Sequence, residues 1–137
     1  MKTIVSRILL VLTVALCVVA AQAQSTVMLK GNVPFNFSIG DRSLPSGEYT
    51  VKALDSEIEA WYDPNGRGLF LVKTIPSGQQ LDPGTTKLVF HRYGSEYVLT
   101  QVCSEGKSHD VISRPGNQRI AKTQKFETVA VLMTSHR

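Results

Sequence analysis

The sequence predicts an all-β fold: a single small antiparallel β-sandwich or small barrel of about seven to eight strands, behind an N-terminal signal peptide. Two observations predict this fold class. Apolar residues recur with a period of two rather than 3.6, which is typical of strands with one buried face. Turn signals rich in Gly, Pro, Asp and Asn separate the apolar segments at fairly regular spacing, as in all-β sandwiches and barrels.

The amino terminus has the parts of a secretory signal. Lys2 and Arg7 give a positive start, residues 8–21 form an apolar run broken only by Thr13, and Ala21-Gln22-Ala23 supplies the small residues that a signal peptidase reads. The alternative is an uncleaved membrane anchor, but a run of 14 residues is shorter than the ~20 that a spanning helix needs. The sequence therefore predicts cleavage between Ala23 and Gln24.

The mature chain, residues 24–137, has 114 residues, which is enough for one domain with a modest core. Loss of Lys2 and Arg7 leaves 13 basic residues against 11 acidic ones, so the net charge falls from +4 to +2. Such a domain lacks the clustered positive charge that nucleic-acid backbones require. We expect an exported protein, periplasmic or secreted, with no nucleic-acid partner and no membrane span after signal cleavage.

The cysteines do not form a disulfide framework. Cys17 lies in the predicted signal, and Leu16 before it is larger than the residue that lipoprotein processing requires, so lipidation is not expected. Cys103 is then the one cysteine of the mature chain, which excludes an intramolecular disulfide. An intermolecular bridge and a reactive thiol remain open, but we favour a small buried side chain in the strand segment Tyr97–Cys103.

The first half of the mature chain contains three predicted strands. The segment Val33–Ile39 alternates apolar and polar residues, and Pro34 within it indicates a sheet edge or a strand start. After two turn signals, a second strand is predicted at residues 49–53 and a third at residues 58–62.

The second half continues the same pattern. Asp63-Pro64-Asn65-Gly66 is a strong turn signal that joins the third strand to an antiparallel strand at residues 69–75. Residues 76–86 contain two prolines and two glycines and are predicted as the longest loop. Asn117–Lys125 is the one predicted helical segment, and Phe126–Met133 is predicted as the closing strand.

The segment Lys87–Val102 combines a histidine, an arginine and two tyrosines around one glycine, and it is predicted to be a hairpin. Gly94-Ser95 suits a two-residue type II′ turn. That turn implies four cross-strand pairs: Tyr93 with Glu96, Arg92 with Tyr97, His91 with Val98, and Phe90 with Leu99. Arg92 then lies against the Tyr97 ring, and the polar residues are better explained as cross-strand partners than as a site. A three-residue loop that pairs Arg92 with Glu96 is the alternative.

The motifs of common catalytic and metal sites are missing from the sequence. Ser108-His109-Asp110 cannot form a triad, because neighbours on an extended chain point in opposite directions. The sequence has no Gly-x-Ser-x-Gly, His-x-x-x-His or Cys-x-x-Cys motif, and its histidines and Cys103 show no zinc-ligand spacing. A calcium loop starting at Asp63 would place Arg67 and Thr74 at ligand positions, which refutes it. We therefore expect no enzyme, metal or cofactor.

The weak candidates for a binding surface are Asp55, Glu57, Glu59 and Trp61. On a strand, alternate positions would put the three carboxylates ~7 Å apart on one face, where they could hold a cation. The favoured interpretation is a solvated face lying opposite an apolar one formed by Ile58, Ala60 and Tyr62. Trp61 would share the carboxylate face and contact a carbohydrate or a peptide if exposed; otherwise it packs under a neighbouring strand or loop.

Four segments together resemble a group of small exported all-β proteins common in acidobacteria. These segments are Val33-Pro34-Phe35-Asn36-Phe37, Leu44–Val51, Lys87–Gly94 and Glu127-Thr128-Val129. The resemblance covers nearly the whole mature chain and implies a shared all-β domain and export, but it transfers no catalytic or binding residue. Similar proteins often carry tryptophan where this chain has Cys103, which favours a packing role for that position.

Three functional classes remain open. The favoured one is a non-catalytic exported or cell-envelope β-domain with a structural or binding role toward an unknown envelope or extracellular partner. The alternative is a small β-barrel carrier of an apolar ligand, and an enzyme is the least favoured. A cavity lined by Phe35, Phe37 and Phe90 would favour the carrier, a solid core with an exposed aromatic face would favour the binding domain, and convergent polar groups around His91 would favour the enzyme.

Overall fold

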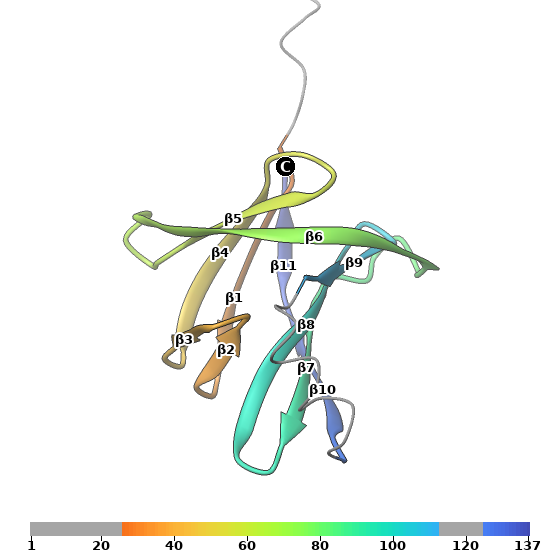
Figure 1. Cartoon of the computed structure of the whole chain (residues 1–137). Coiled ribbons are helices and arrows are strands. Elements are labelled where there is room, and N and C mark those ends of the chain that lie inside the picture. The colour runs from red at the N-terminus through yellow and green to blue at the C-terminus, as the bar shows by residue number, and fades with distance from the viewer. Residues whose placement is uncertain (1–25, 113–124) are drawn as a thin grey trace, which may run out of the picture.

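The computed structural model describes residues 26–112 and 125–137, and every regular element in these ranges is a β-strand (Figure 1). The all-β prediction is confirmed. The strands are β1 (Met28–Val33), β2 (Phe37–Ile39), β3 (Arg42–Leu44), β4 (Gly47–Ala53), β5 (Ile58–Tyr62), β6 (Gly68–Gln80), β7 (Lys87–Tyr93), β8 (Glu96–Ser104), β9 (Lys107–Val111), β10 (Glu127–Leu132) and β11 (Thr134–His136). The predicted signal, its cleavage site and residues 117–124 of the predicted helical segment lie outside the described ranges.

The strands form one mixed, open sheet in the order β10-β7-β8-β9-β6-β5-β4-β1-β11, with β2 joined to β8 and β3 joined to β2. The pairings are antiparallel except for one parallel bridge, between Ser38 of β2 and Val98 of β8. The end strands β10 and β11 are not paired with each other, so the sheet of the described residues does not close. A sandwich or barrel therefore stays a prediction.

The described residues form eleven strands where seven or eight were predicted, in part because of proline. The predicted strand Val33–Ile39 is divided, since Pro34 cannot donate a ladder hydrogen bond: β1 ends at Val33 and β2 begins at Phe37. The alternation within it holds, because Val33, Phe37 and Ile39 are buried and Phe35 packs against them.

Strand β6 is longer than predicted and changes partners along its length. Its first part pairs with β5, and its second part, from Thr74 onward, pairs with β9. The segment 76–80, predicted as loop, belongs to this strand, although its register shifts between Pro76 and Gln80. Figure 1 shows β6 running across the molecule, so that it connects the two parts of the sheet.

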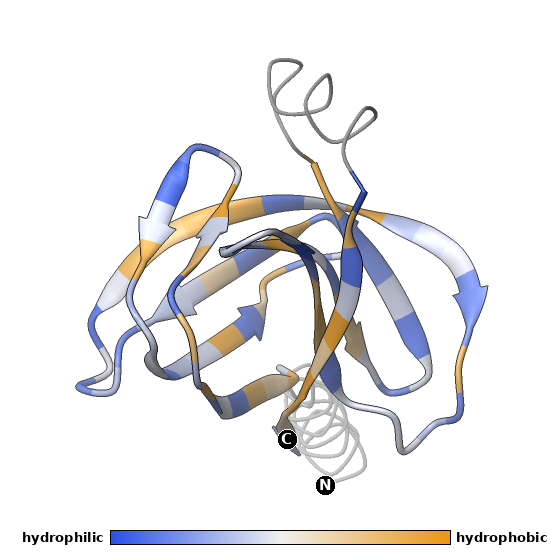
Figure 2. Ribbon diagram, turned by 90° about the horizontal axis from the view of Figure 1, so that it is seen from below, coloured by the Kyte–Doolittle hydropathy of each residue, from blue (hydrophilic) through white to orange (hydrophobic). Residues whose placement is uncertain are grey.

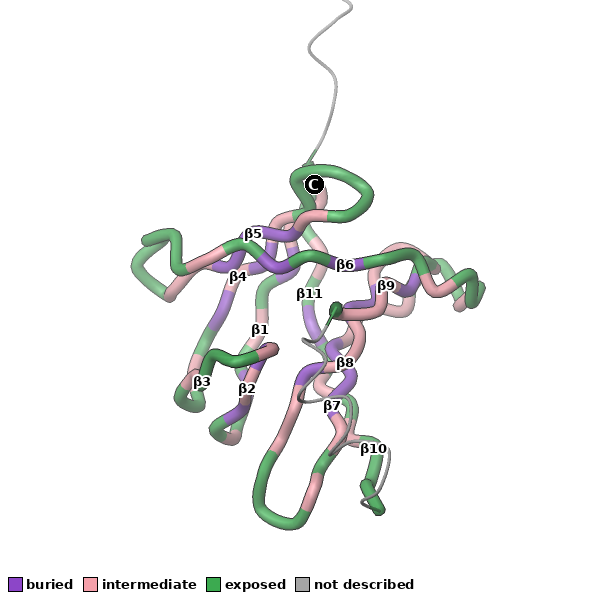
Figure 3. Tube along the Cα trace, in the orientation of Figure 1, coloured by how far each residue is buried: buried purple, intermediate pink, exposed green. Residues whose placement is uncertain are grey.

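One hydrophobic core lies between these two parts. It draws buried residues from β1, β4, β5 and β6 on one side and from β2, β7 and β8 on the other. Apolar and polar residues alternate along many of the strands that surround it (Figure 2). Buried residues lie along the middle of the strands, whereas the tip of the β7–β8 hairpin is exposed (Figure 3). The fold thus presents this hairpin tip to solvent from a packed base.

Candidate functional site

The β7–β8 hairpin has the predicted register. All four predicted pairs are present, from Tyr93 opposite Glu96 to Phe90 opposite Leu99. Gly94 has a φ of 62° and Ser95 has no positive φ, which agrees with a type II′ turn. Arg92 stabilises the tip through two contacts. Its Nε donates a hydrogen bond to the Gly94 carbonyl oxygen at 2.8 Å, and its Cζ lies 5.7 Å from the centroid of the Tyr97 ring.

A β-bulge further along this hairpin was not anticipated. The register shifts between Val89 and Phe90, which leaves Thr100 unpaired, and the Thr100 hydroxyl donates to the Val89 carbonyl oxygen at 3.1 Å. The extra residue turns Val102 back to the core side, where it pairs with Leu88. The bulge therefore lets β8 bend around the core while the tip of the β7–β8 hairpin remains exposed to solvent.

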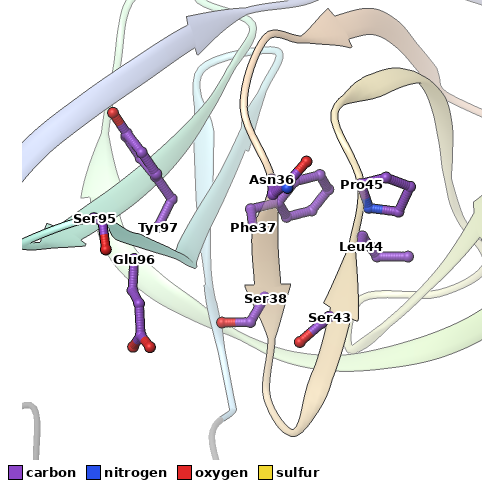
Figure 4. Close-up of a pocket in the computed structure, with 9 residues that line it drawn as sticks. All are labelled: Asn36, Phe37, Ser38, Ser43, Leu44, Pro45, Ser95, Glu96 and Tyr97. Atoms are coloured by element: carbon purple, nitrogen blue, oxygen red, sulfur yellow. The ribbon is translucent and has the colours of Figure 1, made fainter.

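A groove of about 510 Å³ lies on one side of the hairpin tip, and we call it the hairpin groove. It opens where β2 and β8, which pair only at Ser38 and Val98, separate from each other. Figure 4 shows its walls. The lining residues are Asn36, Phe37, Ser38, Ser43, Leu44, Pro45, Ser95, Glu96 and Tyr97. Hydroxyl, amide and carboxylate groups thus stand beside apolar side chains.

Both faces of the Tyr97 ring are occupied, so this ring is not a free platform in the hairpin groove. Phe35 stacks on one face, with 3.8 Å between ring centroids and 13° between ring planes. The Arg92 guanidinium lies over the ring as well, and since Phe35 fills one face, it takes the other. Tyr97 presents only its edge and hydroxyl to a ligand.

A second groove, of about 440 Å³, lies on the β10 side of the same tip, and we call it the aromatic groove. Arg92, Gly94, Lys125, Phe126 and Glu127 line it. Phe126 is an exposed ring in this groove, and the His91 ring stacks on it at 3.9 Å with 15° between the planes. Burial lowers the pKa of His91, which favours the neutral imidazole. His91 therefore supports an aromatic surface on the outer face of β7.

The predicted carboxylate face is wrong. Asp55 and Glu57 precede β5 and lie in the exposed turn after β4, where Asp55 Oδ1 accepts hydrogen bonds from the backbone N–H groups of Glu57 at 2.7 Å and Ile58 at 2.8 Å. Glu59 and Trp61 do share one face of β5, but that face is the core side, and Trp61 is fully buried. The four residues form neither a cation site nor an exposed surface, because only Glu59 and Trp61 belong to the strand.

Glu59 is instead a carboxyl group inside the core. The structure gives no hydrogen-bond partner, among the described residues, to Glu59 Oε2 or to Trp61 Nε1. Burial raises the pKa of Glu59 to about 7. A proton on this carboxyl therefore stabilises the folded chain.

Cys103 is buried, as predicted, and unpaired. Burial raises the pKa of its thiol, which keeps it protonated; the Ser108 hydroxyl beside it lowers that pKa to a smaller extent, although the two groups do not meet hydrogen-bond geometry. Ser108 and Asp110 lie on one face of β9, whereas His109 lies on the opposite face. These three consecutive residues do not converge.

The rings that would line a carrier cavity fill the centre of the molecule. Phe90 is fully buried, and Phe35 and Phe37 contact it edge to face with centroids 5.0 and 5.3 Å away. Trp61 and Tyr49 pack against Phe37 from the other part of the sheet. These contacts describe a solid aromatic core, not a cavity lined by the three phenylalanines.

Neither a protein-family model, a curated protein nor a solved structure matches the chain. Across residues 26–112 and 125–137, no group of three His, Cys, Asp or Glu side chains is placed to hold a metal ion. The same described ranges contain no helix long and apolar enough to cross a membrane. The two grooves and the core are therefore the features that bear on function.

Proposed function

We propose that the protein is a non-catalytic exported β-domain that binds an envelope or extracellular partner at the tip of its β7–β8 hairpin. The observation that carries this proposal is the pair of grooves that flank the tip, of about 510 and 440 Å³. Six of the nine residues that line the hairpin groove and two of the five that line the aromatic groove belong to strands, which hold their side chains in fixed positions. The filled aromatic core supports a binding domain over a carrier of an apolar ligand.

The shared core supports a finer description of the fold as well. Residues from both parts of the sheet pack together, including Trp61 from β5 and Phe90 from β7. We propose that the two parts act as the layers of a sandwich, with β6 as the strand that passes from one layer to the other.

Export is part of the same proposal. The mature protein begins at Gln24, because the apolar run ends in Ala21-Gln22-Ala23. N-terminal sequencing of the protein recovered from the envelope or medium of its own host tests this start. Recovery of the exported form with Met1 would contradict it.

Two serine variants test binding in the hairpin groove. Ser43 lines this groove, so Ser43→Arg places a long side chain across it, whereas Ser56→Arg adds the same charge to the exposed turn before β5. Binding of the purified mature domain to washed envelopes of its host is measured over a range of protein concentrations. We expect Ser43→Arg to weaken binding about tenfold and Ser56→Arg to change it less than twofold. Equal binding by both variants would exclude this groove, and no binding by the parent would refute the proposed function.

A further inference from the structure

The aromatic groove differs from the hairpin groove in having an exposed aromatic ring, that of Phe126, in its lining. The His91 ring stacks on the Phe126 ring, with 3.9 Å between the ring centroids and 15° between the ring planes. The centroid of the Tyr93 ring lies 5.8 Å from that of Phe126, on the same outer side of β7. His91 covers one face of Phe126, yet Phe126 remains 47% exposed and lines the groove. Phe126 is therefore supported by His91, and about half of the residue remains open to a ligand in the groove.

We propose that the aromatic groove is a saccharide site that takes a β-linked chain of glucose or N-acetylglucosamine units. This inference rests on the proposed binding function and names its ligand class. Pyranose rings with equatorial substituents expose axial C–H groups on each face, and these groups carry partial positive charge. The face of an aromatic ring is negative, so a sugar of this type packs flat on Phe126.

The rim of the groove has the groups that bind neighbouring hydroxyls. Arg92 Nη1 and Glu127 Oε2 lie 3.6 Å apart; the Glu127 side chain is 77% exposed and the Arg92 side chain is 45% exposed. The Arg92 Nε already donates to the Gly94 carbonyl oxygen, so the two Nη groups are the donors for sugar hydroxyls, and the carboxylate accepts two hydrogen bonds. This arrangement matches vicinal hydroxyl pairs on a sugar. Lys125 adds a third charged side chain to the lining.

The composition of the lining argues against a peptide. Phe126 is the one apolar side chain among the five lining residues, whereas grooves that hold peptides need several apolar pockets for successive side chains. A sugar in the hairpin groove is disfavoured for a different reason: Phe35 and Arg92 occupy the faces of the Tyr97 ring. The two sides of the hairpin tip are thus chemically distinct.

The test is titration of the mature domain with two probes, a cellohexaose and a hexamer of β-1,4-linked N-acetylglucosamine, monitored by calorimetry. Phe126→Ala removes the ring, and Phe126→Leu removes the ring face while retaining an apolar side chain against His91. The matched control is Leu132→Ala, which removes another exposed apolar side chain from the same strand, β10. We expect at least one probe to bind the parent, about tenfold weaker binding by both Phe126 variants, near-parental binding by Phe126→Tyr, and no change with Leu132→Ala.

Failure of both probes to bind the parent would overturn the inference. Binding that survives both Phe126→Ala and Phe126→Leu would overturn it too, since the sugar would then lie elsewhere. Neither result would refute the proposed function, because loss of envelope binding by Ser43→Arg tests the other groove. If the parent binds neither probe and no envelope material, both proposals fail together.

Discussion

The buried carboxyl of Glu59 makes the stability of the domain depend on pH in a direction that can be worked out. Its pKa is raised from 4.5 in the unfolded chain to about 7 in the folded one. Below pH 4.5 the group is protonated in both states. Between pH 4.5 and 7 the unfolded chain releases the proton while the folded chain retains it, so stability falls as pH rises. Above pH 7 the loss is complete and constant.

The size of this loss follows from the shift. The pKa of Glu59 rises from 4.5 to about 7, and each pKa unit corresponds to about 1.36 kcal/mol. The free energy of unfolding therefore falls by about 3 kcal/mol. Glu59 is 5% exposed, so water screens this cost little. That loss is a large fraction of the 5–15 kcal/mol with which a typical domain is stabilised, roughly a fifth or more.

The perturbation is Glu59→Gln, which keeps the shape of the side chain and removes its titration. We expect the stability difference between parent and variant to change by about 3 kcal/mol between pH 4 and pH 8, in favour of the variant at high pH. Urea unfolding at several pH values measures it, and Trp61, the one tryptophan of the chain and fully buried, reports unfolding by its fluorescence. Glu57→Gln is the matched control, because Glu57 is exposed two residues away. A Glu59→Gln variant with the same pH dependence as the parent would refute the reasoning.

Three other predictions concern packing. Cys103 should react slowly with a thiol reagent in the native protein and rapidly in denaturant, because it is buried and its pKa is raised; a fast native reaction or a reducible dimer would contradict this. Gly106→Ala should destabilise the domain by about 1–3 kcal/mol, since φ is 78° and the new Cβ would lie 2.9 Å from a backbone oxygen, whereas Gly84→Ala, with open space around it, should cost less than about 0.5 kcal/mol. Tyr97→Ala should lower the midpoint of thermal unfolding, with a cost of about 2–3 kcal/mol from the lost burial and ring stacking together, and an unchanged midpoint would show that these contacts are unimportant.

Local turn chemistry explains what the sequence could predict about the hairpin. A two-residue loop leaves one way to pair the strands, and a glycine in its first position supplies the positive φ. The contact of Arg92 with Tyr97 then follows from register alone. The bulge at Thr100 and the two grooves could not be predicted in this way, because they depend on how β8 meets β2 and how β7 meets β10, strands far apart in the sequence.

The aromatic groove could not be predicted from the sequence for the same reason. His91 was interpreted as a cross-strand partner of Val98, which is confirmed. Its stacking with Phe126 was not anticipated, since it requires β10 to pair with β7 so that Thr128 lies opposite His91. An aromatic residue at the start of the predicted closing strand Phe126–Met133 was the only sequence signal available.

The orientation of β5 was predicted wrongly for an energetic reason. Its bounds were right, but the prediction buried Ile58, Ala60 and Tyr62 and exposed Glu59 and Trp61, whereas Glu59, Ala60 and Trp61 are the buried residues. The predicted face carries three apolar residues and the observed face carries one tryptophan, so counting apolar residues favours the wrong face. Burial of the tryptophan ring system, 150–250 Å², is worth roughly 4–6 kcal/mol at about 25 cal/mol per Å². That gain exceeds the cost of about 3 kcal/mol for keeping Glu59 protonated at neutral pH. Trp61 also lies opposite Val51 of β4 and Phe70 of β6, which are apolar neighbours for its ring. The burial of Trp61 therefore determines which face of β5 points into the core, and Glu59 is buried because it lies on the same face.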